Sequence, residues 1–138
     1  MKLFFALVLF ALFTVDQSIA NVKNNKKLIR VTLAVEFVAI GKPNPPPQTF
    51  FIQKGTYAID AFLKKNSTQC YNIVYTVSKF GAYITTVCDV KQTANDLWFF
   101  YINNKESPVG VSCYEVKNND KLTLSYETYP ESQAHDEL

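Results

Sequence analysis

Residues 98–102 constrain the fold more than any other part of the sequence, because five large apolar side chains (WFFYI) run directly into Asn103-Asn104. Successive side chains of a β-strand point to opposite faces, so this strand carries rings on both faces. Asparagine tolerates positive φ better than other non-glycine residues, so the Asn pair predicts a tight turn. A second turn is predicted at Asn118-Asn119-Asp120, and the apolar–polar alternation over 121–127 predicts a half-buried strand after it.

Two strands and one helix are predicted upstream. Residues 29–37 alternate between apolar and polar side chains, which is typical of a strand with one buried face. The proline-rich segment 41–47 ends it as a stiff loop, an interpretation favoured over a docking segment for a proline-binding partner. A short second strand is predicted at 49–53. Thr56 is the predicted N-cap of a short helix, whose apolar face is formed by Ala58, Ile59, Phe62 and Leu63.

The remaining strands are expected to form a hairpin. Residues 71–77 alternate along one strand, the chain turns at Phe80-Gly81, and 83–88 returns as the partner strand. Strand segments outnumber the single helix, and no second domain boundary is visible. The sequence therefore predicts one α+β domain in which one sheet is folded across one short helix.

Three cysteines follow residue 20: Cys70, Cys88 and Cys113. If the hairpin turns at Phe80-Gly81, Cys70 and Cys88 lie nearly opposite each other, so we expect a disulfide between them. A Cys88–Cys113 bridge is the alternative. The remaining thiol is expected to be buried and inert, which is the commoner fate, or else to form an intermolecular bridge.

Both ends of the chain carry targeting signals. Residues 1–20 have a positive start, an apolar stretch too short for a comfortable membrane span, and small residues before a cleavage point, which predicts a signal peptide. Residues 21–27 are expected to be a flexible arm and 28–128 the domain, followed by a tail, 129–138. The tail ends in an HDEL sequence, an address read by the retrieval receptor of the endoplasmic reticulum, made up of His135, Asp136, Glu137 and Leu138.

These signals predict a protein of the endoplasmic reticulum lumen or secretory pathway. In that compartment the sequon at Asn66 is a candidate for N-glycosylation, which requires this corner of the fold to face solvent.

The sequence argues against an enzyme. The only histidine, His135, belongs to the retrieval signal, and neither a Cys-x-x-Cys motif nor a phosphate-binding glycine loop occurs. The net charge of +2 is no footprint for nucleic acid. We predict no catalytic residues, no metal site, no nucleic-acid partner and no membrane span after signal cleavage.

The order W-x-F-Y-I-N-N, then P-V-G-V, then Y-E-V-K-N-N-D-K-L-T-L-S-Y-E resembles the transcobalamin-like C-terminal domain (DUF4430), the small domain of intrinsic factor and the transcobalamins. The segment 80–90, a glycine–aromatic step followed by a Thr-rich strand, resembles the other signature of that domain. The resemblance covers roughly residues 28–127 and implies a β-grasp-like arrangement of the mixed sheet.

In the cobalamin carriers this domain closes over the corrin ring, so the resemblance implies that cobalamin is a possible ligand here. The matching positions form a strand and a loop: Trp98, Phe100, Pro108, Val109, Gly110 and Val111. Gly110 lacks a Cβ and would allow a ligand to approach the backbone. The helical barrel of the carriers is absent from this sequence, and the domain has no histidine to coordinate cobalt.

Two functions follow from these observations. The first is a non-enzymatic binding module for a small apolar, planar or corrinoid-like ligand. The alternative is a protein-interaction module retained in the lumen, which binds a partner through an aromatic surface or an exposed sheet edge. For any single ring, packing in the core is the simpler interpretation.

Overall fold

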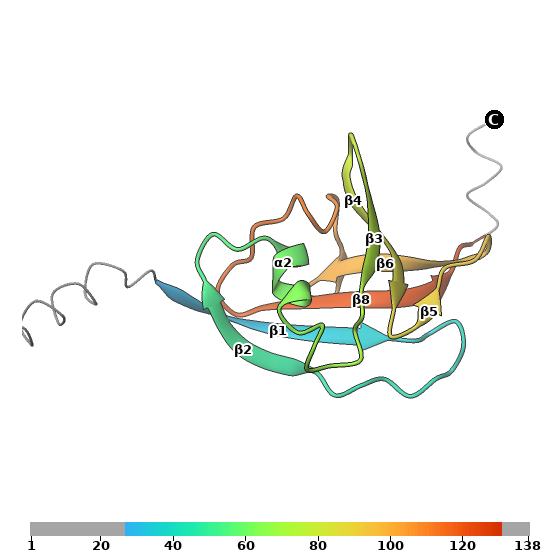
Figure 1. Cartoon of the computed structure of the whole chain (residues 1–138), viewed down its shortest axis with the longest axis horizontal. Helices are drawn as coiled ribbons and strands as arrows, with labels where there is room; N and C mark the ends of the chain where they lie inside the picture. The colour runs from blue at the N-terminus through green and yellow to red at the C-terminus, as the bar shows by residue number, and fades with distance from the viewer. Residues whose placement is uncertain (1–26, 131–138) are drawn as a thin grey trace, which may run out of the picture.

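The computed structural model describes residues 27–130, which form a single domain (Figure 1). The predicted signal peptide, almost all of the N-terminal arm and the HDEL residues lie outside this range. Within it, no helix is both long enough and apolar enough to cross a membrane.

The larger of two sheets has five strands and includes the aromatic-rich segment 98–102. Its strand order is β2-β1-β8-β6-β7. The central strands β1 and β8 are parallel, whereas β2, β6 and β7 pair antiparallel with their neighbours, so the sheet is mixed. The strands are β1 (Leu28–Glu36), β2 (Gln48–Gln53), β6 (Asp96–Ile102), β7 (Lys105–Glu106) and β8 (Asp120–Thr128).

The second sheet has three strands, in the order β3-β4-β5, and it stands across the first (Figure 1). It consists of β3 (Val74–Ser78), β4 (Gly81–Val87) and β5 (Val90–Lys91). The predicted α+β fold with a mixed sheet on one short helix, α2 (Ala58–Leu63), is confirmed. The prediction of a single sheet was wrong, because the structure has two. The difference arises because β4 has its strand partners in β3 and β5, so the hairpin does not join the five-stranded ladder.

The core lies between the main sheet on one side and α2 with the base of β4 on the other. Val31, Leu33 and Leu122 contribute from the sheet, and Phe62 from the helix is fully buried against them. Alternation along β1 therefore predicted its buried face correctly. In β8 the prediction was incomplete, because the polar positions Thr123 and Ser125 are buried as well.

Burial on the second face of β8 comes from neighbouring strands. Thr123 lies opposite Tyr101 and Ser125 lies opposite Phe99 across the β6–β8 ladder. A small side chain on a central strand is covered when its cross-strand neighbour is a large ring. Thr123 and Ser125 are accordingly 4% and 0% exposed.

The helix begins without the predicted N-cap. The Thr56 hydroxyl donates to the carbonyl of Gln53, and no side chain caps α2. The first amides of a helix have no partner within it. Here two of them donate to a distant loop: Ala58 N–H to the carbonyl of Tyr114 (2.9 Å) and Ile59 N–H to that of Val111 (3.0 Å).

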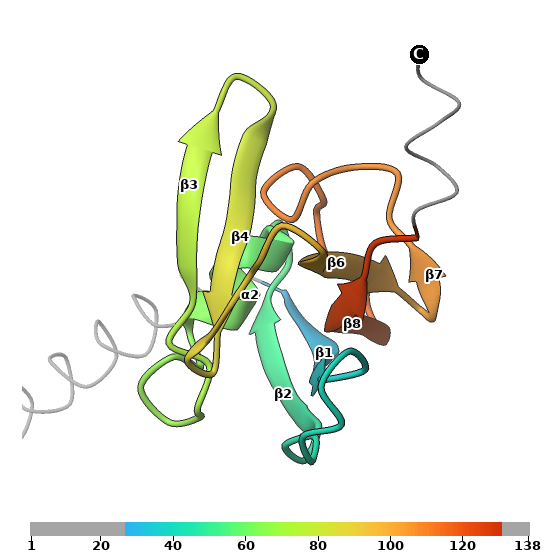
Figure 2. The ribbon, with the colours of Figure 1, turned by 90° about the vertical axis from the view of Figure 1, so that its right-hand side faces the viewer.

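The predicted strand 71–77 is shorter in the structure and is differently buried. Tyr71 and Ile73 are buried, but they precede β3, and all five residues of β3 are exposed. Beyond this base, the β3–β4 hairpin projects from the rest of the fold (Figure 2). The alternation over 71–77 did not show that every residue of β3 faces solvent.

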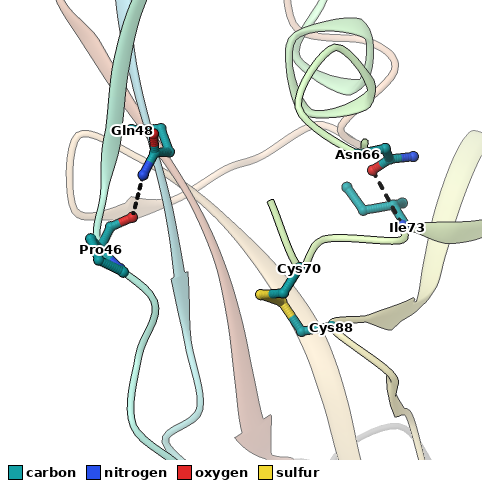
Figure 3. Close-up of a disulfide and its surroundings, with 6 residues drawn as sticks. All are labelled: Pro46, Gln48, Asn66, Cys70, Ile73 and Cys88. Atoms are coloured by element: carbon teal, nitrogen blue, oxygen red, sulfur yellow. Dashed lines mark hydrogen bonds between the residues drawn. A yellow bond between two sulfur atoms is a disulfide. The ribbon is translucent and has the colours of Figure 1, made fainter. Parts of the chain in front are cut away.

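The predicted Cys70–Cys88 disulfide is present, with the two Cα atoms 4.9 Å apart (Figure 3). The hairpin turns at Lys79-Phe80, one residue before the predicted Phe80-Gly81, since Ser78 pairs with Gly81. Cys88 N–H donates to the carbonyl of Tyr71 (2.7 Å), which continues the pairing past the strand ends. Cys113 is the free cysteine of residues 27–130, and it is exposed, so the expectation of a buried thiol was wrong.

Both predicted Asn turns are confirmed. Asn103 and Asn104 have φ values of 50° and 67° and join β6 to β7 as a two-residue hairpin loop. Asn119 has a φ of 69° immediately before β8 begins.

Candidate ligand-binding hollow

A hollow of about 120 Å³ lies where the side of β4 faces β6 and the loop 107–119. We call it the β4–β6 hollow. Three strands and the loop contribute to its lining, which consists of Ala82, Tyr83, Ile84, Trp98, Phe100, Gly110, Val111 and Leu124.

Trp98 forms part of the floor and is 7% exposed. Its indole N–H donates to the carbonyl of Val90 (2.9 Å). The ring packs edge-on against Phe37 and lies 5.0 Å, centroid to centroid, from Tyr126. These contacts make Trp98 a core residue with one side next to the hollow, so little of it is free to touch a ligand directly.

Phe100 is two residues further along the same face of β6, and it is only half-buried. Its ring meets Tyr114 in an edge-to-face contact with centroids 6.3 Å apart. With the exposed ring of Tyr83, it offers the aromatic surface that an incoming apolar molecule would meet first.

The loop is held at its far end by the buried carboxylate of Asp120, which is 5% exposed. This carboxylate accepts hydrogen bonds from the Tyr114 hydroxyl (2.7 Å), the Asn103 amide (2.9 Å) and the Lys117 N–H (2.8 Å). Burial, and then the hydrogen bond to Asp120, raise the pKa of Tyr114 to about 12. The network joins the two Asn turns to the loop.

The other attachment of the loop is the start of α2, through the two hydrogen bonds from Ala58 and Ile59. Val111, whose carbonyl accepts the bond from Ile59, is 3% exposed and forms one wall of the hollow. The loop is therefore positioned by the helix and by Asp120 before any ligand arrives, an arrangement that lowers the cost of ordering a site.

Four of the six residues named from the resemblance lie together at this hollow: Trp98, Phe100, Gly110 and Val111. Pro108 and Val109 are on the exposed part of the loop and do not line it. A Cβ on Gly110 would lie 3.7 Å from the carbonyl oxygen of Ala82, an ordinary contact, so protein packing does not require glycine there.

The packing requires glycine at Gly81 instead. It has a φ of +104°, and a Cβ there would lie 2.6 Å from the Ser112 hydroxyl oxygen. That hydroxyl accepts a hydrogen bond from Ala82 N–H (2.8 Å), which brings β4 against the loop. The sequence predicts a turn at this glycine, but the contact with Ser112 depends on a residue 31 positions away and has no local signal.

The lining residues contributed by β4 and β8 were also missed. Ile84 and Leu124 are buried walls, whereas Tyr83 forms the exposed rim. The alternation of both strands was readable in the sequence. What it could not show is that β4 crosses over β6.

A larger hollow of about 400 Å³ lies at the start of β1. Lysines and other polar side chains form much of its rim, and no aromatic ring lines it. Within residues 27–130, no group of three or more His, Cys, Asp or Glu side chains is placed to hold a metal ion. The residues that line the β4–β6 hollow are more apolar than those of the larger hollow, and they include Trp98 and Phe100 of the aromatic strand β6.

Comparison with known proteins identifies relatives of this fold. A family model described as "Domain of unknown function (DUF4430)" matches residues 55–128. No curated protein matches the sequence.

Several solved structures, including these two, are similar to this chain. One is haptocorrin in complex with Cbi, at 16% identity and a TM-score of 0.67, over 78% of this chain and 27% of haptocorrin. The other is a protein from Ruminococcus gnavus ATCC 29149, described as a candidate metal-binding protein, at 13% identity and a TM-score of 0.57, over 74% of this chain and 99% of that one. At such identities the likeness shows the fold. The chain spans about a quarter of the length of haptocorrin.

Proposed function

The chain belongs to the DUF4430 family, and from this premise we propose that it is a non-enzymatic binding module that holds a small apolar or corrinoid-like ligand at the β4–β6 hollow. The observation that carries the proposal is an open hollow beside the aromatic strand, walled by apolar residues of β4, β6, β8 and the loop. Ligand sites in proteins are mostly concave and apolar, with aromatic walls. The structural likeness to haptocorrin, which is in complex with Cbi, supports the choice of ligand class.

The size of the hollow indicates that this domain supplies part of a site. Its volume of about 120 Å³ is well below the roughly 300–1,000 Å³ of pockets that enclose a small molecule. The ligand would therefore rest on Phe100 and Tyr83 with its other face uncovered, and a partner would complete the enclosure.

Ligand binding can be followed through the single tryptophan of the chain, because Trp98 lies in the floor of the hollow. We expect cobalamin to quench Trp98 fluorescence in a saturable titration. Phe100→Ala should weaken binding by about tenfold or more, since it removes an aromatic wall that contributes stacking and apolar contact. Absence of quenching at ligand concentrations up to about 100 μM, the limit of a weak specific site, would contradict the proposal.

The matched control is Phe51→Ala. Phe51 is 66% exposed on β2 and does not line the hollow, so this variant should bind as the unaltered chain does. Circular dichroism of both variants separates loss of the site from loss of the fold. Equal weakening in both would indicate non-specific association of the ligand with exposed rings.

We further propose that the protein resides in the lumen of the endoplasmic reticulum. The proposal rests on the signal-peptide pattern of residues 1–20 and on the HDEL sequence at 135–138, which the retrieval receptor would bind. Deleting the last four residues should shift the protein from cell lysate to medium. Continued retention would contradict this assignment.

Glycosylation at Asn66 belongs to the same proposal. Its side-chain oxygen accepts a hydrogen bond from Ile73 N–H (3.3 Å; Figure 3). Ser67 and Thr68 of the sequon are exposed. Glycosidase treatment should increase the gel mobility of the expressed protein, and Thr68→Ala should abolish that shift. An unaltered mobility after the enzyme would mean that the sequon is unoccupied.

The alternative function, a protein-interaction module, is favoured by a different observation, the exposed β3–β4 hairpin. This surface does not depend on a ligand at the hollow. A contact through Trp98 itself is not part of this alternative, because the ring is buried.

A further inference from the structure

The β3–β4 hairpin exposes several large apolar side chains to water. Five of them, between positions 74 and 83, are exposed by fractions from 39% to 79%: Val74, Tyr75, Val77, Phe80 and Tyr83. Scattered single exposed residues are normal on a monomer, but several on one short hairpin are typical of an interaction site.

The outer strand of this hairpin is a sheet edge. Within residues 27–130, β3 pairs with β4 on one side only, and Figure 2 shows it on the outer side of the hairpin, away from β6 and β8. Natural proteins protect such edges with Lys, Pro, short strands or bulges. The five residues of β3, VYTVS, contain no charge and no proline, although one register shift against β4 occurs at Val74/Tyr75.

We propose that β3 is the interface for a second copy of this chain, paired antiparallel to β3 of the first copy about a two-fold axis at Thr76. In this register Tyr75 of one copy lies opposite Val77 of the other, and Val74 lies opposite Ser78. An aromatic ring opposite a β-branched side chain is a favourable cross-strand pair. The strand is therefore complementary to itself.

The backbone pattern agrees with this register. In a hairpin with a two-residue loop, the residues that flank the loop form a hydrogen-bonded pair, and such pairs alternate with non-hydrogen-bonded ones. Ser78 and Gly81 flank the loop here. The backbone groups of Ser78 and Thr76 thus face β4, whereas those of Tyr75 and Val77 face outward. The two-fold axis at Thr76 brings these outward groups opposite one another.

The exposed apolar side chains of β3 itself, Val74, Tyr75 and Val77, add to the contact between the two edges. If each has an area on the order of 150 Å², their exposed fractions amount to roughly 250 Å² on one hairpin. Two hairpins together bring about 500 Å² of apolar surface to the interface, the size of a small and weak contact, so the backbone hydrogen bonds between the two edges carry most of the pairing.

Charge favours the antiparallel arrangement. Lys79, at the tip, is the charged residue of segment 72–87. Antiparallel pairing about Thr76 places the two tips at opposite ends of the joint sheet, about 20 Å apart at roughly 3.3 Å per residue. The two ammonium groups are then too far apart to repel strongly, whereas parallel pairing would bring them together.

The interface uses the outer edge of the hairpin, and the β4–β6 hollow lies on its inner side. Dimerisation is consequently a property separate from ligand binding. Failure of either the ligand titration or the association experiment leaves the other result unaffected.

A cysteine at the axis tests the register directly. We place Thr76→Cys in a chain that also carries Cys113→Ser, so that the exposed native thiol cannot cross-link. Residues at the axis form a non-hydrogen-bonded pair with Cα atoms about 4.5 Å apart, within the range that a disulfide spans. We expect a covalent dimer on mild oxidation.

Ser78→Cys in the same background is the matched control. The strand places the two Ser78 residues about 13 Å apart at roughly 3.3 Å per residue, beyond the reach of a disulfide. Ser78→Cys should therefore remain monomeric on denaturing gels under conditions that cross-link Thr76→Cys. Equal cross-linking of both variants, or of neither, would overturn the proposed register.

Sedimentation equilibrium of the Cys113→Ser chain tests the association itself. We expect a concentration-dependent dimer and at least about tenfold weaker association in Val77→Lys, because an ammonium group would have to be desolvated in the interface. Val77 is 75% exposed, so the change should leave the fold intact. Val38→Lys, at a site 65% exposed outside the hairpin, should associate normally.

A chain that stays monomeric at concentrations up to about 100 μM would have a dissociation constant too high for a specific contact. That result would overturn the proposal and leave the hairpin to a different partner. A dimer that persists in Val77→Lys would also overturn it, because the contact would then lie elsewhere on the molecule.

Discussion

The carboxylate of Asp120 should contribute more to stability than any other charged group described here. It is 5% exposed and accepts hydrogen bonds from Asn103, Tyr114 and Lys117. Asp120→Ala leaves three donors without their partner. Each unsatisfied buried donor costs about 1–3 kcal/mol. Because Tyr114 and Asn103 retain some access to water, we expect a total loss of about 3–5 kcal/mol at neutral pH.

Asp120→Asn separates charge from shape. The amide oxygen can replace the carboxylate oxygen that accepts from Tyr114 and Lys117, but the amide nitrogen then faces the donor of Asn103. The loss should be about 2 kcal/mol, the contribution of one hydrogen bond to a charged group. A small domain has only about 5–15 kcal/mol of stability in total, so both losses are readily measured.

The assay is urea unfolding followed by Trp98 fluorescence, with free energies of unfolding from linear extrapolation. Asp60→Ala is the control, since Asp60 is an exposed residue in the first turn of α2 and should cost less than about 1 kcal/mol. If Asp120→Ala costs no more than this control, the carboxylate does not hold the loop and the reasoning fails.

Three further predictions concern Gly81, the disulfide and two tyrosines. Gly81→Ala should destabilise the fold by about 1–3 kcal/mol, because its φ is +104° and its Cβ would meet Ser112; thermal unfolding measures this. Cys70→Ser combined with Cys88→Ser should cost about 3 kcal/mol, because the bridge spans a separation of 18 residues, and urea unfolding without reductant measures it. The pKa values of Tyr101 and Tyr114 are both raised to about 12, first by burial and then by hydrogen bonds to carboxylates. The folded state therefore keeps protons that the unfolded state loses near pH 10, so this stabilisation is complete below about pH 10 and is lost as pH rises toward 12. In an absorbance titration, Tyr114→Phe should show one fewer tyrosine that ionises above the usual pH range.

Each of these has a clear contrary result. Gly81→Ala with unchanged thermal stability would mean that Ser112 moves aside at no cost. A double cysteine variant as stable as the parent would mean that the base of the hairpin is held by packing alone. Ionisation of all tyrosines near pH 10 would remove the evidence that Tyr101 and Tyr114 are desolvated in the folded chain.

Local chemistry decided the parts of this fold that short-range geometry governs. The local residue types favour the Asn103-Asn104 turn, the strand before it and the strand after Asn119, because these residues adopt few other conformations. The Cys70–Cys88 pairing followed from the same logic, because a hairpin fixes its own register once its turn is located.

Errors occurred where a local signal competed with a distant partner. Thr56 has the chemistry of an N-cap, yet the first amides of α2 are satisfied by the carbonyls of Val111 and Tyr114. Thr123 and Ser125 read as solvent-facing, yet large rings of β6 cover them. Residues 71–77 alternate as one strand, yet β3 begins only at Val74 and its hairpin projects from the body of the molecule.

The sequence by itself determined the strands, the turns, the single short helix and the resemblance to a known domain, because periodicity and turn chemistry are properties of neighbouring residues. Tertiary structure decided that β4 crosses β6, and so brought Ile84 and Tyr83 to the side of Phe100. It also decided that β3, within the part of the chain that the structure describes, has β4 as its one strand partner. A hollow and a free edge both depend on which segments meet in space, and pairing between distant segments has no local pattern from which to read it.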